Sequence, residues 1–213
     1  STLMRSSAAS DVYKRQLSYL ITNTTMNMDR LVIKQILGNE QVTQYYVVSL
    51  IGKTLVLLIA PINTIVISYL TKRKERLTRS QFGKAVLAGG GVSLAFFVAC
   101  QIGTPLFVWL FYRNLYESVK GIVTVVNLAQ ILGLFSAFLF ILVLTFTDER
   151  WQLWIQLAHF CILLVSSVLA ARTYGMMGFA VASLGANSLR VAAVVILGIV
   201  KAGKDKGDRN ADR

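Results

Sequence analysis

The chain has little of what soluble enzymes use: its 213 residues include one histidine, two cysteines, two prolines and ten acidic residues. Both cysteines, Cys100 and Cys161, fall in apolar segments without the spacing of metal ligands, so we expect them to pack as small hydrophobic side chains. The sequence contains no glycine-rich phosphate loop, no ATP-binding motif and no pair of carboxylates within one apolar segment. It also offers no plausible Ser, His and Asp set around His159. We therefore expect a protein that is not an enzyme and that requires no cofactor or metal.

Charge is scarce as well. Charged residues make up 15% of the chain and apolar residues 55%, and the mean hydropathy is +0.60, which lies outside the range of ordinary soluble domains. Lys and Arg nevertheless outnumber Asp and Glu by 22 to 10, an excess that in a soluble domain would suggest a nucleic-acid partner. The basic residues lie between apolar runs, so the lipid bilayer is the expected partner and nucleic acid is not.

Six segments approach the length of about twenty mainly apolar residues that a helix needs to cross the hydrocarbon core. They lie at about residues 17–37, 42–70, 85–111, 122–147, 152–172 and 177–200. The first is the least hydrophobic because polar residues interrupt it, and a strict hydropathy count returns five. We predict an all-α membrane protein with six transmembrane helices.

Two connections carry half of the basic residues, the link at residues 72–84 and the tail after Val200. Under the positive-inside rule both should be cytoplasmic, and the even number of spans between them allows this. A first span at 17–37 agrees with the rule, because without it Arg30 and Lys34 would lie in an external segment. The six-helix unit is expected at 17–200, followed by a disordered basic tail at 201–213.

The first sixteen residues are polar and lack the apolar core of a signal peptide. Residues 6–16 read SSAASDVYKRQ and resemble a translated adapter sequence found at the ends of metagenomic gene predictions. We expect residues 1–16 to be non-native or disordered. The native chain would then have been cut upstream of about Leu17, which makes this sequence a C-terminal fragment.

Charged side chains inside the spans are candidate functional residues, because an ionised group at the bilayer centre costs about 2.5 to 3.5 kcal/mol even on the most lenient scale. In the first span four polar residues spaced by four, three and four positions share one helical face: Asn23, Asn27, Arg30 and Lys34. Asp29 adjoins this stripe and can neutralise part of it. Alternatively, Lys34 reaches the outer interface and Arg30 pairs locally with Asp29.

Two more cations lie deep in other spans. Lys53 is about eleven residues from the start of its span, and Arg190 is about ten residues from the basic tail, on a stripe with Ser183 and Asn187. Three deep cations with few acids to match predict a shared, water-filled cavity of positive potential, which suits phosphate or pyrophosphate. Uncharged polar residues of the spans are expected to hydrogen-bond one helix to another: Asn127, Gln130, Gln152, Gln156 and His159.

Two stretches carry a family resemblance. Residues 28–38 read MDRLVIKQILG and residues 42–46 read VTQYY, which places an Asp-Arg pair in a span, then a Leu-Gly turn, then a Tyr at the start of the next span. Residues 174–182 read YGMMGFAVA, a Gly-x-x-Gly-x-Ala start of a late span. Together they resemble the second half of bacterial polysaccharide and O-antigen flippases, which belong to the multidrug, oligosaccharidyl-lipid and polysaccharide exporter superfamily.

The resemblance implies twelve to fourteen helices in two six-helix lobes, around a cavity that passes a lipid-linked oligosaccharide across the bacterial inner membrane by alternating access. Six spans correspond to one lobe. The implied partners are the missing N-terminal lobe, an undecaprenyl-pyrophosphate-linked glycan and polysaccharide polymerase or assembly proteins. The candidates for the anionic headgroup site are then Arg30, Lys53, Arg190, Lys34, Asn27, Asn187 and Asp29.

Two other functions remain open from the sequence. A multidrug or cation antiporter of the same superfamily would need buried carboxylates, and Asp29 is the one acid within the predicted spans. A non-transporting membrane scaffold in glycan assembly would use the polar stripes only to bind helices together. Cysteines introduced at Asn27, Arg30 and Asn187 separate the scaffold from the transporters, because scaffold contacts would be inaccessible to water.

Overall fold

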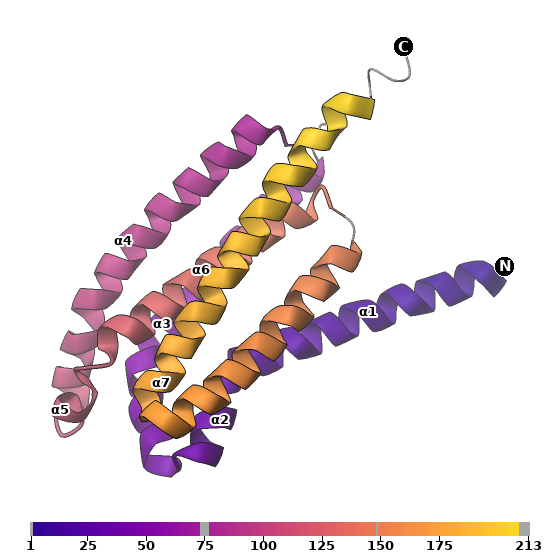
Figure 1. The fold of residues 1–213 in the computed structure, drawn as a ribbon. Coiled ribbons are helices and arrows are strands. Elements are labelled where there is room, and N and C mark those ends of the chain that lie inside the picture. Colours follow the sequence, from indigo (N-terminus) through magenta and orange to yellow (C-terminus); the bar gives the residue numbers. More distant parts are fainter. Residues whose placement is uncertain (1, 73–76, 148, 209–213) are drawn as a thin grey trace.

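A computed structural model describes residues 2–72, 77–147 and 149–208, which are almost entirely helical and include no strand. The prediction of an all-α protein is therefore confirmed for the described part of the chain (Figure 1). The helices are α1 (Thr2–Met26), α2 (Met28–Ile36), α3 (Asn39–Lys72), α4 (Arg79–Phe111), α5 (Tyr116–Val119), α6 (Val123–Leu144) and α7 (Glu149–Asp208).

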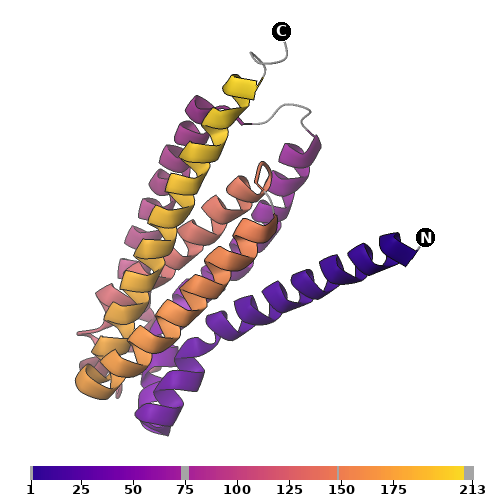
Figure 2. The ribbon, with the colours of Figure 1, turned by 45° about the vertical axis from the view of Figure 1, so that its right-hand side comes forward.

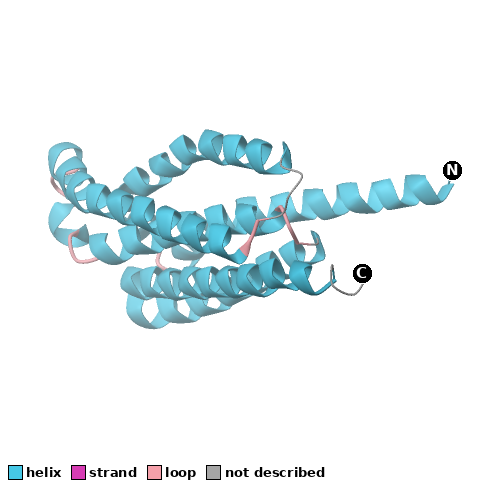
Figure 3. Cartoon of the chain, turned by 90° about the horizontal axis from the view of Figure 1, so that it is seen from above, coloured by secondary structure: helices cyan, strands magenta, loops and turns pink. Residues whose placement is uncertain are grey.

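The long helices form a bundle in which α6 packs against α3, α4 and α7. α7 consists of two helical segments that meet at Gly175, whose φ of 63° and ψ of −145° lie outside the helical region. The segments before and after Gly175 run back along the bundle beside each other (Figure 1). The amino-terminal half of α1 projects away from the other helices (Figures 2 and 3).

The number of helices able to span a membrane differs from the prediction. Among the described residues three helices are long and apolar enough, Arg79–Phe111, Val123–Leu144 and Leu153–Ala202, and not six. The third contains both predicted spans 152–172 and 177–200, because its 50 residues exceed twice the length of one crossing. α3, which holds the predicted span 42–70, does not meet these criteria over its described residues.

The predicted first span, 17–37, is also not one helix. α1 ends at Met26 and α2 begins at Met28, because the backbone of Asn27, at φ −106° and ψ 10°, leaves the helical region. The Asn27 side chain donates to the carbonyl oxygen of Asn23 at 2.9 Å, a local bond that competes with the backbone ladder. The break divides the predicted span between α1 and α2, so each helix contains only part of its apolar residues.

Helix also covers both terminal segments. α1 begins at Thr2 and α7 continues to Asp208, while residues 209–213 lie outside the described part. No glycine or proline interrupts residues 2–16, so nothing in that segment breaks a helix. The non-native origin of residues 1–16 stays a prediction.

Apolar side chains gather in two clusters. The first, the turn-end cluster, joins α2, α3, α5, α6 and both segments of α7, and includes Ile33, Val48, Val119, Val126, Ala171 and Phe179. The second, the tail-end cluster, joins α4, α6 and the second segment of α7, and includes Phe82, Leu139, Val143 and Val194. Burial of apolar surface thus holds the bundle together near its two ends, and the polar residues of the spans lie between them.

The basic link and the tail lie at the same end of the bundle. Thr78 and Gln81 form a reciprocal capping box that fixes the start of α4 after the link. There Arg79 Nε donates to the carbonyl oxygen of Ile199 at 3.2 Å, near the end of α7. The turn at Gly175 and the short helix α5 lie at the opposite end (Figure 1). This arrangement agrees with an even number of crossings between the two basic segments.

Gly175 should be required for the reversal of α7. Its φ of 63° with ψ −145° is a region that residues with a Cβ rarely adopt. Gly175→Ala should therefore lower the free energy of unfolding in mixed micelles by about 2 kcal/mol. Gly185→Ala is the control, since a Cβ there meets nothing within 4 Å and the backbone is helical. Equal stability of the two variants would contradict the role of Gly175.

Candidate functional site

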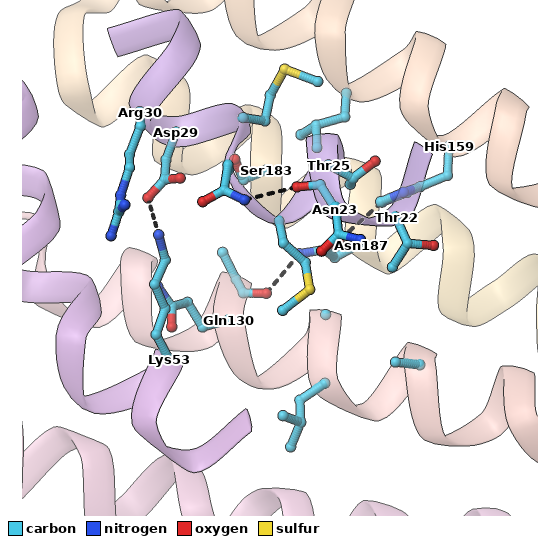
Figure 4. Close-up of a pocket in the computed structure, with 18 of the residues that line it drawn as sticks. Thr22, Asn23, Thr25, Asp29, Arg30, Lys53, Gln130, His159, Ser183 and Asn187 are labelled. Atoms are coloured by element: carbon cyan, nitrogen blue, oxygen red, sulfur yellow. Dashed lines mark hydrogen bonds and ion pairs between the residues drawn. The ribbon is translucent and has the colours of Figure 1, made fainter. Parts of the chain in front are cut away.

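A cavity of about 570 Å³ lies between α1, α2, α3, α6 and both segments of α7. Its lining includes the end of α1 and the start of α2, and it shares Met28, Tyr45 and Phe179 with the turn-end cluster. Figure 4 shows polar side chains of α1, α2, α3, α6 and α7 around it. Six of the seven sequence-predicted site residues line it: Asn27, Asp29, Arg30, Lys53, Asn187 and Arg190.

Asp29 and Lys53 form an ion pair across the cavity, from α2 to α3 (Figure 4). The Asp29 side chain is 9% exposed and that of Lys53 is 29% exposed. The second carboxylate oxygen of Asp29, Oδ1, is buried without a hydrogen-bond partner. The alternative of a local pair with Arg30 is not what the structure contains, because successive residues of a helix point about 100° apart.

Arg30 instead stacks on an aromatic ring. Its guanidinium carbon lies 4.7 Å from the centroid of the Tyr46 ring, and Lys53 Nζ lies 5.9 Å from the same centroid. A ring face attracts cations, so Tyr46 holds both cations near one place. The Arg30 side chain remains exposed, and its hydrogen-bond donors stay available to a ligand in the cavity.

Arg190 enters the cavity from the second segment of α7. Its guanidinium carbon lies 5.1 Å from the centroid of the Phe140 ring, and its Nε is buried without a hydrogen-bond partner. Buried donors are satisfied in the great majority of cases. An arginine held on an aromatic face with a free donor is suited to bind an anion that enters the cavity.

Asn187 joins three helical segments. Its Nδ2 donates to the carbonyl oxygen of Ala129 on α6 at 2.7 Å, and its Oδ1 lies 3.0 Å from His159 Nε2. Since the Ala129 carbonyl can only accept, Oδ1 faces His159 and Nε2 must carry the hydrogen. A Cβ on Gly133 would lie 3.0 Å from Asn187 Nδ2, so the absence of a side chain there permits the close approach of α6 and α7.

The remaining two candidates are placed differently. Asn27 lines the cavity and is exposed, whereas Lys34 is exposed on α2 and does not line it. Lys34 lies on the face of α2 that carries Arg30 but one turn further along the helix, and the cavity lining on α2 stops at Arg30. Asn23, Asn27 and Arg30 still face the cavity together.

The expected hydrogen bonds between helices are confirmed for three of the five uncharged residues, and the side chain of Gln152 lies outside the described part of the structure. Asn127 donates to the Cys100 carbonyl oxygen at 3.1 Å and accepts from Thr104 at 3.2 Å. Gln156 bonds to α1 through Thr22 at 3.1 Å. His159 meets Asn187 as above, while Gln130 lines the cavity. These bonds fix the helices around the cavity and leave the cations free to act within it.

Sequence reasoning missed the two aromatic rings under the arginines. Tyr46 lies on the helix after Arg30, and Phe140 lies fifty residues before Arg190, so no spacing rule within one helix could connect them. It also missed the partner of Asp29, although a lone acid within the spans had to meet one of the deep cations. Three cations and one acid surround the cavity, which leaves it positive.

Neither a protein-family model nor a curated protein nor a solved structure matches this chain.

Proposed function

We propose that this chain is one lobe of a flippase-type transporter, which moves lipid-linked glycan units across the bacterial inner membrane by alternating access. The observation that carries the proposal is the cavity itself, which Arg30, Lys53 and Arg190 line together and in whose lining Asp29 is the one acid. An undecaprenyl-linked substrate presents a pyrophosphate, and a cationic, water-filled cavity offsets its loss of hydration.

The pyrophosphate would occupy the donors that lack partners. Arg190 offers its unpaired Nε, and Arg30 offers an exposed guanidinium that can bind two oxygens at once. Lys53 would exchange its carboxylate partner, Asp29, for a phosphate oxygen. That exchange would remove the ion pair between α2 and α3, which would couple substrate binding to the packing of these two helices.

The topology of the proposed transporter follows from the charges. We assign the end with residues 72–84 and the tail to the cytoplasm under the positive-inside rule, and the Gly175 turn to the opposite side. The six predicted spans would form the C-terminal lobe, with the N-terminal lobe closing the open side of the cavity. The glycan, which is bulky and polar, would lie between the lobes, and polymerase or assembly proteins would receive it.

Antiport of a cationic drug is the second candidate, and one observation favours it. The buried Asp29 has a carboxylate oxygen without a partner, as a cation site would require. The same carboxylate already neutralises Lys53, and the two arginines would repel a cationic drug. The charge balance therefore supports the anionic substrate.

Neutralising the arginines tests the proposal. In the full-length protein, Arg190→Gln and Arg30→Gln should each reduce export of surface polysaccharide at least tenfold, roughly the effect of losing one charge-assisted hydrogen bond. Arg113→Gln is the control, because Arg113 is exposed, stacks on Trp109 and lies outside the cavity. Unchanged export in both cavity variants would reject this substrate site, and faster efflux of cationic dyes would favour the antiporter.

Cysteine accessibility separates a transporter from a scaffold. Cysteines placed at Asn27, Arg30 and Asn187 should react with a charged, membrane-impermeant thiol reagent once it has access to the cavity, and an anionic polyprenyl pyrophosphate should slow the reaction. In a scaffold these polar residues would be packed against other helices, so none of the three cysteines should react.

A further inference from the structure

A second concave surface lies beside the polar cavity and adjoins it on α2, where Met28 lines both. This groove, of about 430 Å³, runs between α2 and the first segment of α7, with a contribution from α1. Its walls are mainly apolar and include Leu31, Val32, Ile36, Leu164 and Val168, and Arg172 lies at one end. An apolar groove on a membrane helix is solvated by lipid chains.

The length of the groove matches one leaflet. On α7 the lining extends from Phe160 to Arg172, which at 1.5 Å per residue is about 18 Å. Half of the hydrocarbon core is about 15 Å thick. Arg172 is three residues before the Gly175 turn, so it lies at the end of the bundle, where a lipid headgroup would be found.

The charge at this end selects the headgroup. Arg172 is exposed, and no carboxylate in the described part of the chain pairs with it. An anionic phosphate neutralises it, whereas the ammonium group of a zwitterionic lipid would compete with the arginine for the same phosphate. Apolar walls one leaflet long that end on an unpaired cation form a complementary surface for a single anionic lipid.

We propose that the groove between α2 and the first segment of α7 binds one anionic phospholipid of the bilayer, with a chain along Val32 and Val168 and the phosphate on Arg172. This site is independent of the glycan cavity and of the transport function. Because α2 borders both surfaces, a bound lipid would pack against the helix that carries Asp29 and Arg30.

The headgroup contact can be tested with the full chain in phosphatidylcholine vesicles that contain spin-labelled phosphatidylglycerol. The motionally restricted fraction should be larger for spin-labelled phosphatidylglycerol than for spin-labelled phosphatidylcholine, and the ratio of the two measures the preference. Arg172→Gln should reduce that preference about fivefold, the effect of one surface cation. Arg113→Gln, an exposed arginine at the same end but outside the groove, should leave it unchanged. Equal effects of the two substitutions would overturn the site.

The apolar part of the groove can be tested separately with a pair of tryptophan variants. Val168→Trp should fill the groove and remove the restricted label, whereas Val165→Trp, on the same segment at a position 58% exposed and outside the groove, should not. If Val168→Trp retains the restricted label, the lipid chain does not lie in the groove. If Val168→Trp does not fold, Arg172→Gln still tests the proposal. Displacement of the label by polyprenyl phosphate but not by unlabelled phosphatidylglycerol would assign the groove to an isoprenoid lipid and would also overturn it.

Discussion

Replacing Lys53 by methionine should lower the free energy of unfolding in mixed micelles by about 4 kcal/mol, because it leaves a buried carboxylate without its cation. Asp29 is 9% exposed and already has one oxygen without a partner. Methionine keeps most of the length of the lysine stem, so the loss of packing is small. The measurement is equilibrium unfolding in a denaturing detergent, followed by circular dichroism.

Asp29→Asn is the informative comparison. It should cost less, about 1–2 kcal/mol, because the remaining Lys53 is 29% exposed and can be solvated by water in the cavity. The double variant should recover most of the loss caused by Lys53→Met, since it leaves no unpaired buried charge. Additive losses in the double variant would show that the two side chains do not interact.

Asn187→Leu should have the second largest effect, a loss of about 3 kcal/mol in the same unfolding measurement. Leucine removes the donor to the Ala129 carbonyl and the acceptor for His159 Nε2, and each buried group left without a partner costs about 1–3 kcal/mol. The side chain at position 187 also packs closely on Gly133 of α6, where a planar amide fits and the branched end of leucine would be crowded.

Ser188→Leu serves as the control for this position. Ser188 is the next residue, is exposed, and bonds only to the carbonyl oxygen of Leu184 among its described contacts. Its substitution should change the free energy of unfolding by less than about 0.5 kcal/mol. A similar loss in both variants would mean that the Asn187 contacts to α6 and His159 contribute nothing specific.

Much of the fold could be predicted because it depends on two properties that are read directly from the sequence, the length of the apolar segments and the positions of the charges. Apolar length predicted the all-α class, and the charge pattern predicted that the basic link and tail share one end, as the Arg79 to Ile199 bond shows. The number of spans could not be obtained in this way. Hydropathy separated the two apolar runs on either side of Gly175, where two helical segments do meet, but it does not register a backbone break such as the one at Asn27.

The site was predictable in its residue types but not in its pairings. A cation deep in a span must contact either water or an acid. Arg30, Lys53 and Arg190 accordingly line one cavity. The choice of Lys53 over Arg30 as the partner of Asp29 depends on how α2 faces α3, a relation between helices. Lys34 was assigned to the site by periodicity alone, and periodicity gives the face of a helix but not how far along it the cavity extends, which on α2 is as far as Arg30.

The Gly175 turn has a consequence for how the chain would enter a membrane during synthesis. The two segments of α7 are joined by a single non-helical residue, so they would leave the ribosome and partition into lipid as one hairpin. A lone final segment would carry Arg190 into hydrocarbon at a cost of about 2.5 kcal/mol or more. Within the hairpin, His159 of the first segment already meets Asn187 one turn from that arginine, which gives the polar residues of the second segment a partner during insertion.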